Sequence, residues 1–161
     1  MDKKRKIITI IFLALTIVVT LVIIVNAFIP EAQSAAMSDA ISDKITEAYT
    51  PADKKSFYTL VRKSLGHFLL NGINAGFATL TLLFFLKDKG IHRGIGVITA
   101  LFYGCLIAGL SEFIQLFVQG RGATWKDVGI NCLGCLTFVF IIGLVYSIKY
   151  FVKSKRNKAN E

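Results

Sequence analysis

Nine polar or charged residues lie within or beside long apolar stretches of the sequence, several of them at spacings that place them on shared helical faces. Side chains three or four positions apart meet on one face of a helix. Three pairs have this spacing, each in a different stretch: a histidine with an asparagine, a glutamate with a glutamine, and an aspartate with an asparagine. We predict that they form one binding cluster. Its members are Arg62, Lys63, His67, Asn71, Glu112, Gln115, Arg121, Asp127 and Asn131.

The chemistry of this cluster suits an anionic ligand. Arginine makes bidentate contacts with phosphate and lysine adds a point charge, so the three basic members are candidates for binding a phosphate or pyrophosphate headgroup. A divalent metal is a second possibility, because His67, Glu112 and Asp127 are of metal-ligating types. No HExxH-like spacing supports a metal site. We therefore expect neither a metal nor another cofactor.

A purely structural role for the same residues is the alternative. Glu112 would then pair with Arg121 or Lys63, Asp127 would cap the helix that it begins, and the asparagines would join neighbouring helices. Polar and ionisable side chains are costly inside a bilayer, and those that persist usually face the bundle interior and mark functional sites. This general behaviour favours a binding site over a structural network.

The composition is that of an integral membrane protein. The chain has 161 residues, 54% of them hydrophobic, and a mean hydropathy of +0.61, whereas soluble domains are about 45–50% apolar. A helix that spans a bilayer needs about 20 apolar residues, and uncharged or nearly uncharged runs of this length cover residues 7–29, 65–86, 94–118 and 128–148. We predict one all-α domain over residues 1–161, an integral membrane four-helix bundle.

Charge is distributed unequally between the two sides of these spans. The amino-terminal end, the loop at residues 87–93 and a basic tail at residues 149–161 carry twelve Lys and Arg residues against three acids, while the other side carries seven of each. Positively charged loops stay in the cytoplasm, so we predict a multi-pass protein of the plasma membrane with both termini cytoplasmic. Basic residues placed in this way do not form the soluble basic face of a nucleic-acid-binding domain, and we expect no nucleic-acid partner.

Residues 31–64, between the first and second spans, are expected on the extracellular side. Met37, Ile41, Ile45 and Ala48 recur at helical spacing among polar residues, which predicts a short amphipathic helix on the membrane surface. A second short helix is predicted to begin at Pro51, because proline is favoured at the first helical position. The polar cluster is expected at the same, outer side of the bundle.

The order of the polar residues resembles that of the VanZ-like family. The residues that carry the resemblance are the run RKSLGHF at 62–68, followed by Glu112, Gln115, Arg121, Asp127, Asn131 and Gly134. The resemblance covers nearly the whole chain. It implies a small bacterial membrane protein with about four spans. It also implies a link to low-level resistance to the glycopeptide teicoplanin, with which the prototype of the family is associated.

Two functions remain open. In the first, the protein contributes to resistance to teicoplanin-type glycopeptides by recognising a lipid-linked wall precursor, an anionic membrane lipid or the lipid-tailed glycopeptide at the outer face. In the second, it is a membrane-embedded enzyme that modifies a lipid or lipid-linked headgroup, with His67 or Glu112 as general acid or base. The chain has no recognisable nucleophile elbow, phosphate loop or metal motif, which favours the binder. The sequence leaves the oligomeric state open.

Overall fold

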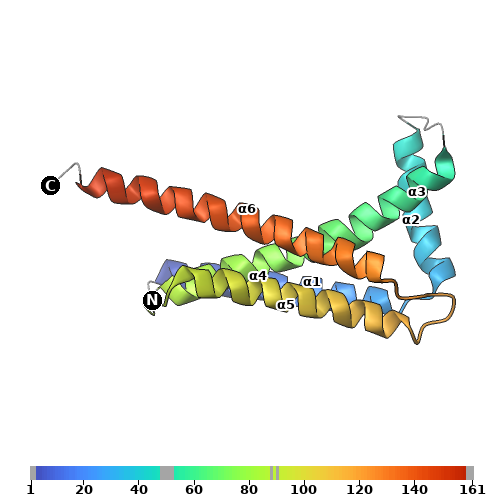
Figure 1. Cartoon of the computed structure of the whole chain (residues 1–161), viewed down its shortest axis with the longest axis horizontal. Coiled ribbons are helices and arrows are strands. Elements are labelled where there is room, and N and C mark those ends of the chain that lie inside the picture. Colours follow the sequence, from blue (N-terminus) through green and yellow to red (C-terminus); the bar gives the residue numbers. More distant parts are fainter. Residues whose placement is uncertain (1–2, 48–52, 88, 90, 159–161) are drawn as a thin grey trace.

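The structure is a computed structural model that describes residues 3–47, 53–87, 89 and 91–158. Within these ranges it describes the backbone but not the side chains at 54–55, 62–65, 150, 153–155 and 157–158. The described residues form helices joined by turns and contain no β-strand (Figure 1). The predicted all-α fold is confirmed.

Four helical segments of the described chain are long and apolar enough to cross a membrane. These segments are α1 (Lys3–Ala27), Ser56–Lys87, α5 (Arg93–Gln115) and Trp125–Lys149, the last being part of α6 (Trp125–Lys158). Both termini lie at one end of the bundle, and α2 (Glu31–Thr46) and α3 (Lys54–Arg62) lie at the other (Figure 1). The prediction of a four-helix membrane protein is confirmed.

The observed helix ends differ from several of the predicted ones. α1 begins at Lys3, inside the amino-terminal basic cluster. α5 ends at Gln115, short of residue 118, and is followed by a turn in which Gly120 has a φ of +77°. α6 continues to Lys158, through most of the predicted tail, because no glycine or proline follows Gly143 to interrupt it.

The second span is continuous with α3. A π-helical stretch, η1 (Lys63–Leu69), joins α3 to α4 (Leu70–Lys87) without a break, whereas the sequence predicted a surface helix that gives way to a span at residue 65. π-Helical turns are rare, and they occur often at functional sites. The change of helical pitch here falls within the run that resembles the VanZ-like family.

α2 and α3 form a pair of helices that projects from the bundle at the end opposite the termini (Figure 1). α2 covers most of the first predicted amphipathic helix, and its apolar residues Met37, Ile41 and Ile45 are all exposed. Ala48 and the predicted helix start at Pro51 lie outside the described residues.

Small residues let α4, α5 and α6 approach one another closely in the centre of the bundle. Ala75 of α4 and Cys135 of α6 are fully buried, and a Cβ added to Gly104 of α5 would lie 2.9 Å from both of their side chains. A Cβ on Gly134 of α6 would lie only 2.1 Å from the carbonyl oxygen of Phe68 in η1. Such packing matters in a membrane, because lipid tails are as apolar as the side chains and give no hydrophobic drive for helix association.

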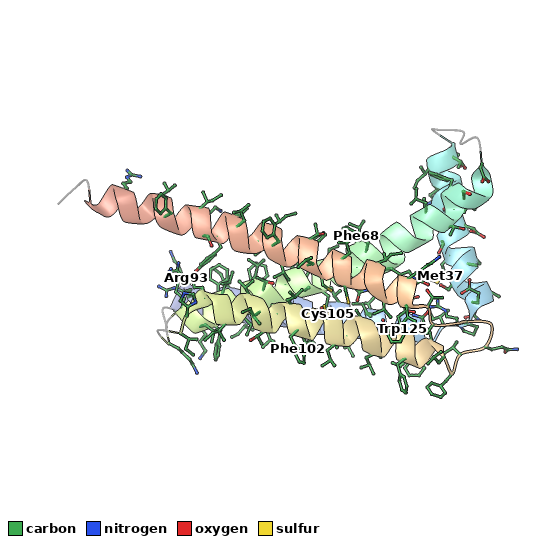
Figure 2. The ribbon with its side chains drawn as sticks, viewed as in Figure 1. Met37, Phe68, Arg93, Phe102, Cys105 and Trp125 are labelled. Atoms are coloured by element: carbon green, nitrogen blue, oxygen red, sulfur yellow. The ribbon has the colours of Figure 1, made fainter. Side chains whose placement is uncertain are left out.

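Large apolar side chains cover the outside of the bundle. Ile98 and Phe102 on α5 and Phe140 on α6 are each at least 66% exposed, and Figure 2 shows Phe102 pointing away from the other helices. Contact of these apolar side chains with water would be unfavourable in free energy. In a bilayer they contact lipid, as expected for membrane-spanning helices.

We expect Gly134→Ala to destabilise the protein by about 1–3 kcal/mol, the usual cost of overpacking, because the new Cβ would collide with the backbone at Phe68. The measurement is thermal unfolding in detergent, followed by circular dichroism. Gly129→Ala is the matched control, since a Cβ at this position of the same helix meets nothing within 4 Å. A Gly134→Ala protein that melts at or above the wild-type temperature would contradict this packing.

Candidate functional site

The carboxylate of Glu112 is the centre of a buried polar network. Glu112 is only 2% exposed. Its Oε1 accepts hydrogen bonds from Nδ2 of Asn131 at 3.1 Å and from Nε2 of Gln115 at 3.4 Å, and Nδ1 of His67 lies 3.3 Å away. A buried carboxylate is stable only with such partners. The three partners come from α6, α5 and η1, so the network joins three elements.

Asn131 links this carboxylate to the second span. Its side chain is completely buried, and its Oδ1 accepts a hydrogen bond from Nδ2 of Asn71 and lies beside Nδ1 of His67, both at 3.1 Å. Nδ2 of Asn71 also donates to the carbonyl oxygen of His67, one turn earlier, at 3.0 Å. The structure therefore brings together five members of the predicted cluster. These are His67, Asn71, Glu112, Gln115 and Asn131.

The neighbours of His67 determine which of its ring nitrogens carries a proton. Nδ1 faces two acceptor oxygens, Oδ1 of Asn131 and Oε1 of Glu112, so Nδ1 must be protonated to hydrogen-bond with either. Nε2 is then the nitrogen left to meet a ligand. The side chain of His67 is 18% exposed and lines a cavity.

Two local features place His67 in the network. Gly134 has no side chain, so the backbone of η1 at Phe68 lies directly on α6. The π-helical turn around His67 then directs the ring toward α5 and α6, where Asn131 and Glu112 lie. Sequence periodicity places His67 and Asn71 on one helical face but gives no sign of the π-helix.

A cavity of about 460 Å³ opens beside His67, at the end of the bundle where α2 and α3 lie. The end of α1, α2, η1, the turn at residues 116–124 and the start of α6 contribute to its walls. Figure 2 shows Met37 of α2 and Trp125 of α6 at this end, and Met37 lines the cavity. Four members of the predicted cluster line it, namely His67, Gln115, Arg121 and Asp127. The polar lining residues that sequence reasoning missed are Asn26, Glu31, Ser34, Ser38 and Thr124.

Arg121 pairs with Glu31 across the cavity wall. Nε of Arg121 lies 3.8 Å from Oε2 of Glu31, and the arginine side chain is only 6% exposed. The structural alternative paired Glu112 with Arg121 or Lys63. His67 lies beside Glu112, Arg121 lies beside Glu31, and the side chain of Lys63 lies outside the described residues. Glu31 follows the first span and is far from Arg121 in the sequence, so helical periodicity gave no signal for this ion pair.

Asp127 and Thr124 stabilise the beginning of α6. The amide nitrogen of Asp127 donates to Oγ1 of Thr124 at 3.1 Å, and the threonine hydroxyl donates to Oδ2 of Asp127 at 2.8 Å. A threonine hydroxyl that accepts from the amide three residues later satisfies one of the free backbone donors at a helix start. Thr124 is therefore the capping residue of α6, the Asp127 carboxylate holds its hydroxyl, and Asp127 also lines the cavity.

The side chains of Arg62 and Lys63 lie outside the described residues. Their backbones are at the junction of α3 and η1, and Val61 and Gly66 on either side line the cavity. Among the described residues, no group of three or more His, Cys, Asp and Glu side chains is placed to hold a metal ion. The cavity offers a guanidinium, an imidazole, amides, hydroxyls and carboxylates to a ligand.

These features define a small multi-pass helical membrane protein with a polar cavity at one end of its bundle. The chain belongs to the VanZ/LLP1 family, whose sequence model matches residues 12–146. This match includes every residue of the polar network and the cavity, and it confirms the family that the sequence resembles. No curated protein and no solved structure matches the chain.

We expect the network to show strong energetic coupling between Glu112 and Asn131. Glu112→Leu and Asn131→Leu each leave a buried polar partner unsatisfied, which typically costs about 1–3 kcal/mol. The double variant removes both partners and should lose less stability than the sum of the two single variants. Unfolding free energies in detergent test this, with Thr137→Val on α6 as control, since its hydroxyl bonds only to its own helix at Leu133. Additive losses would contradict the network.

Proposed function

We propose that this protein binds the headgroup of a lipid-linked or anionic molecule in the cavity beside His67, and that this binding contributes to resistance to teicoplanin-type glycopeptides. The position of Arg121 carries the proposal. Its guanidinium belongs to the cavity wall and is largely buried, and arginine is the side chain best suited to bind phosphate in two-point contacts. The surrounding helices contact lipid, so the acyl chains of such a ligand would remain in the bilayer.

The other lining residues favour a headgroup that carries hydroxyl groups as well as phosphate. Glu31 and Asp127 present carboxylate oxygens, which accept hydrogen bonds from hydroxyls and would repel a bare phosphate. Ser34 and Ser38 add hydroxyls on α2. A sugar attached through phosphate to a lipid, as in a lipid-linked wall precursor, satisfies both kinds of group. The predicted phosphate contacts of Arg62 and Lys63 would add to the phosphate contact of Arg121.

The distribution of charge supports a cavity that faces outward. The cavity lies at the end of the bundle opposite both termini (Figure 1). The excess of Lys and Arg at the termini and at residues 87–93 favours a cytoplasmic location for that end. Lipid-linked wall precursors and glycopeptides meet at the outer face. The association of the family's prototype with teicoplanin resistance supports the same assignment.

A membrane-embedded enzyme is the second candidate, and the position of His67 favours it. Glu112 and Asn131 hold Nδ1, and the side chain of His67 lines the cavity. General bases are commonly oriented in this way by a neighbouring carboxylate. Nε2 would accept a proton from a hydroxyl group of the headgroup or from water, and the Glu112 carboxylate would stabilise the imidazolium that forms.

We expect Arg121→Ala to reduce the teicoplanin minimal inhibitory concentration, in a susceptible host that expresses the protein, to that of the empty vector. The reason is loss of the cation in the cavity wall. Lys126→Ala is the matched control, because this cation is exposed and does not line the cavity. It should leave resistance unchanged. Immunoblots of membranes must show equal amounts of both variants. Wild-type resistance in Arg121→Ala cells would overturn the proposed role of the cavity.

A second experiment separates the binder from the enzyme. Purified protein in nanodiscs is incubated with a labelled lipid-linked glycosyl phosphate, and bound and chemically altered lipid are quantified by chromatography. We expect saturable binding that is weakened in Arg121→Ala, with no new product, since the described residues offer no metal site and the sequence has no recognisable nucleophile elbow. If the wild-type protein forms a product and the His67→Gln variant does not, the protein is an enzyme rather than a binding protein.

A further inference from the structure

A second polar cluster joins α1 to α4 and α5 inside the bundle. Oγ1 of Thr20 in α1 lies 3.1 Å from Oδ1 of Asn74 in α4 and also contacts the hydroxyl group of Tyr103 in α5. The three helices pack against one another (Figure 1), and Tyr103 lies near the middle of α5. None of these three residues lines the cavity beside His67. The cluster is therefore separate from the cavity.

Asn74 has one polar atom that the protein leaves without a partner. The residue is only 1% exposed, and its Nδ2 is buried and forms no hydrogen bond with any residue that the structure describes. A buried N–H group without an acceptor is costly in free energy, and native proteins rarely leave one unbonded. Nδ2 of Asn74 therefore points to a bound ligand that accepts a hydrogen bond.

Two acceptor oxygens of the Glu112 network also lack a partner. Nδ2 of Asn71 donates to the carbonyl oxygen of His67 and to Oδ1 of Asn131, which fixes the orientation of the Asn71 amide. Oδ1 of Asn71 and Oε2 of Glu112 are buried and accept no hydrogen bond from the described part of the chain. Both side chains bond to Asn131, and Asn71 lies one helical turn before Asn74. The three unpartnered atoms thus belong to one region of the bundle core.

These three atoms define the chemistry of the ligand. It must accept a hydrogen bond from Nδ2 of Asn74 and donate to Oδ1 of Asn71 and Oε2 of Glu112. A sodium ion would leave the N–H group without an acceptor, and an ammonium ion has no lone pair to offer. Water accepts and donates, and buried water typically makes about three hydrogen bonds to such groups. We propose that ordered water is bound here and joins the Glu112 network to the cluster at Asn74.

The bound water extends the polar network of the cavity end into the centre of the bundle. It connects His67, through Glu112 and Asn74, to Thr20 and Tyr103, so that α1 joins the network of the other spans. α1 has few buried side chains, and lipid gives no hydrophobic drive for its association. The water site does not rest on the proposed headgroup function, because its three ligating side chains lie outside the cavity lining.

The test is solid-state NMR of the isotope-labelled full chain in phosphatidylglycerol bilayers, with magnetisation transferred from water protons to side-chain amides. We expect rapid transfer to Nδ2 of Asn74, as for Gln115, which lines the cavity. Asn71→Leu removes one acceptor and should lose most of the transfer at Asn74. Thr79→Val is the matched control and should retain it, since this buried hydroxyl of α4 bonds to its own helix, at Ala75.

Four results would overturn the proposal. Wild type that shows transfer at Gln115 but none at Asn74 has no water at this site, and this result stands whether or not the variants fold. Full transfer at Asn74 in Asn71→Leu would mean that the water does not join the two side chains. An equal loss in Thr79→Val would indicate loosened packing instead. A shift of the Asn74 or Glu112 signals when potassium replaces sodium would identify a bound cation in place of water.

Discussion

A single carboxylate, buried where three membrane helices meet, determines how the polar end of this protein is built. Glu112 cannot be left without donors in such a place, because the cost of an isolated buried charge is high. Asn131, Gln115 and His67 supply them to Oε1. Each donor is positioned by the fold, so the network fixes the register of η1 and α6 against α5. His67 is thereby held as a rigid wall of the cavity.

Much of this arrangement follows from the sequence. The four apolar runs predict the spans, and the spacing of His67 with Asn71, and of Glu112 with Gln115, predicts which side chains share a face. These predictions need only helical periodicity and the cost of polar groups in a bilayer. The structure indeed joins these four residues in one hydrogen-bonded network through Asn131.

Other parts depend on tertiary contacts that no local pattern encodes. The ion pair of Arg121 with Glu31 joins the turn after α5 to the start of α2. The π-helical turn of η1 lies where Phe68 closely approaches Gly134, a contact between helices rather than along one. The side of α2 that lines the cavity carries the polar Ser34 and Ser38 together with the apolar Met37 and Ile41. Sequence reasoning placed α2 on the membrane surface and missed this second role.

An electron cryomicroscopy structure of the protein bound to a lipid-linked glycosyl phosphate would show whether the cavity beside His67 receives a headgroup. We expect headgroup density within hydrogen-bonding distance of Arg121 and of Nε2 of His67, with the bonds of Glu112 unchanged. A structure in which the ligand binds elsewhere while this cavity holds no headgroup density would contradict it.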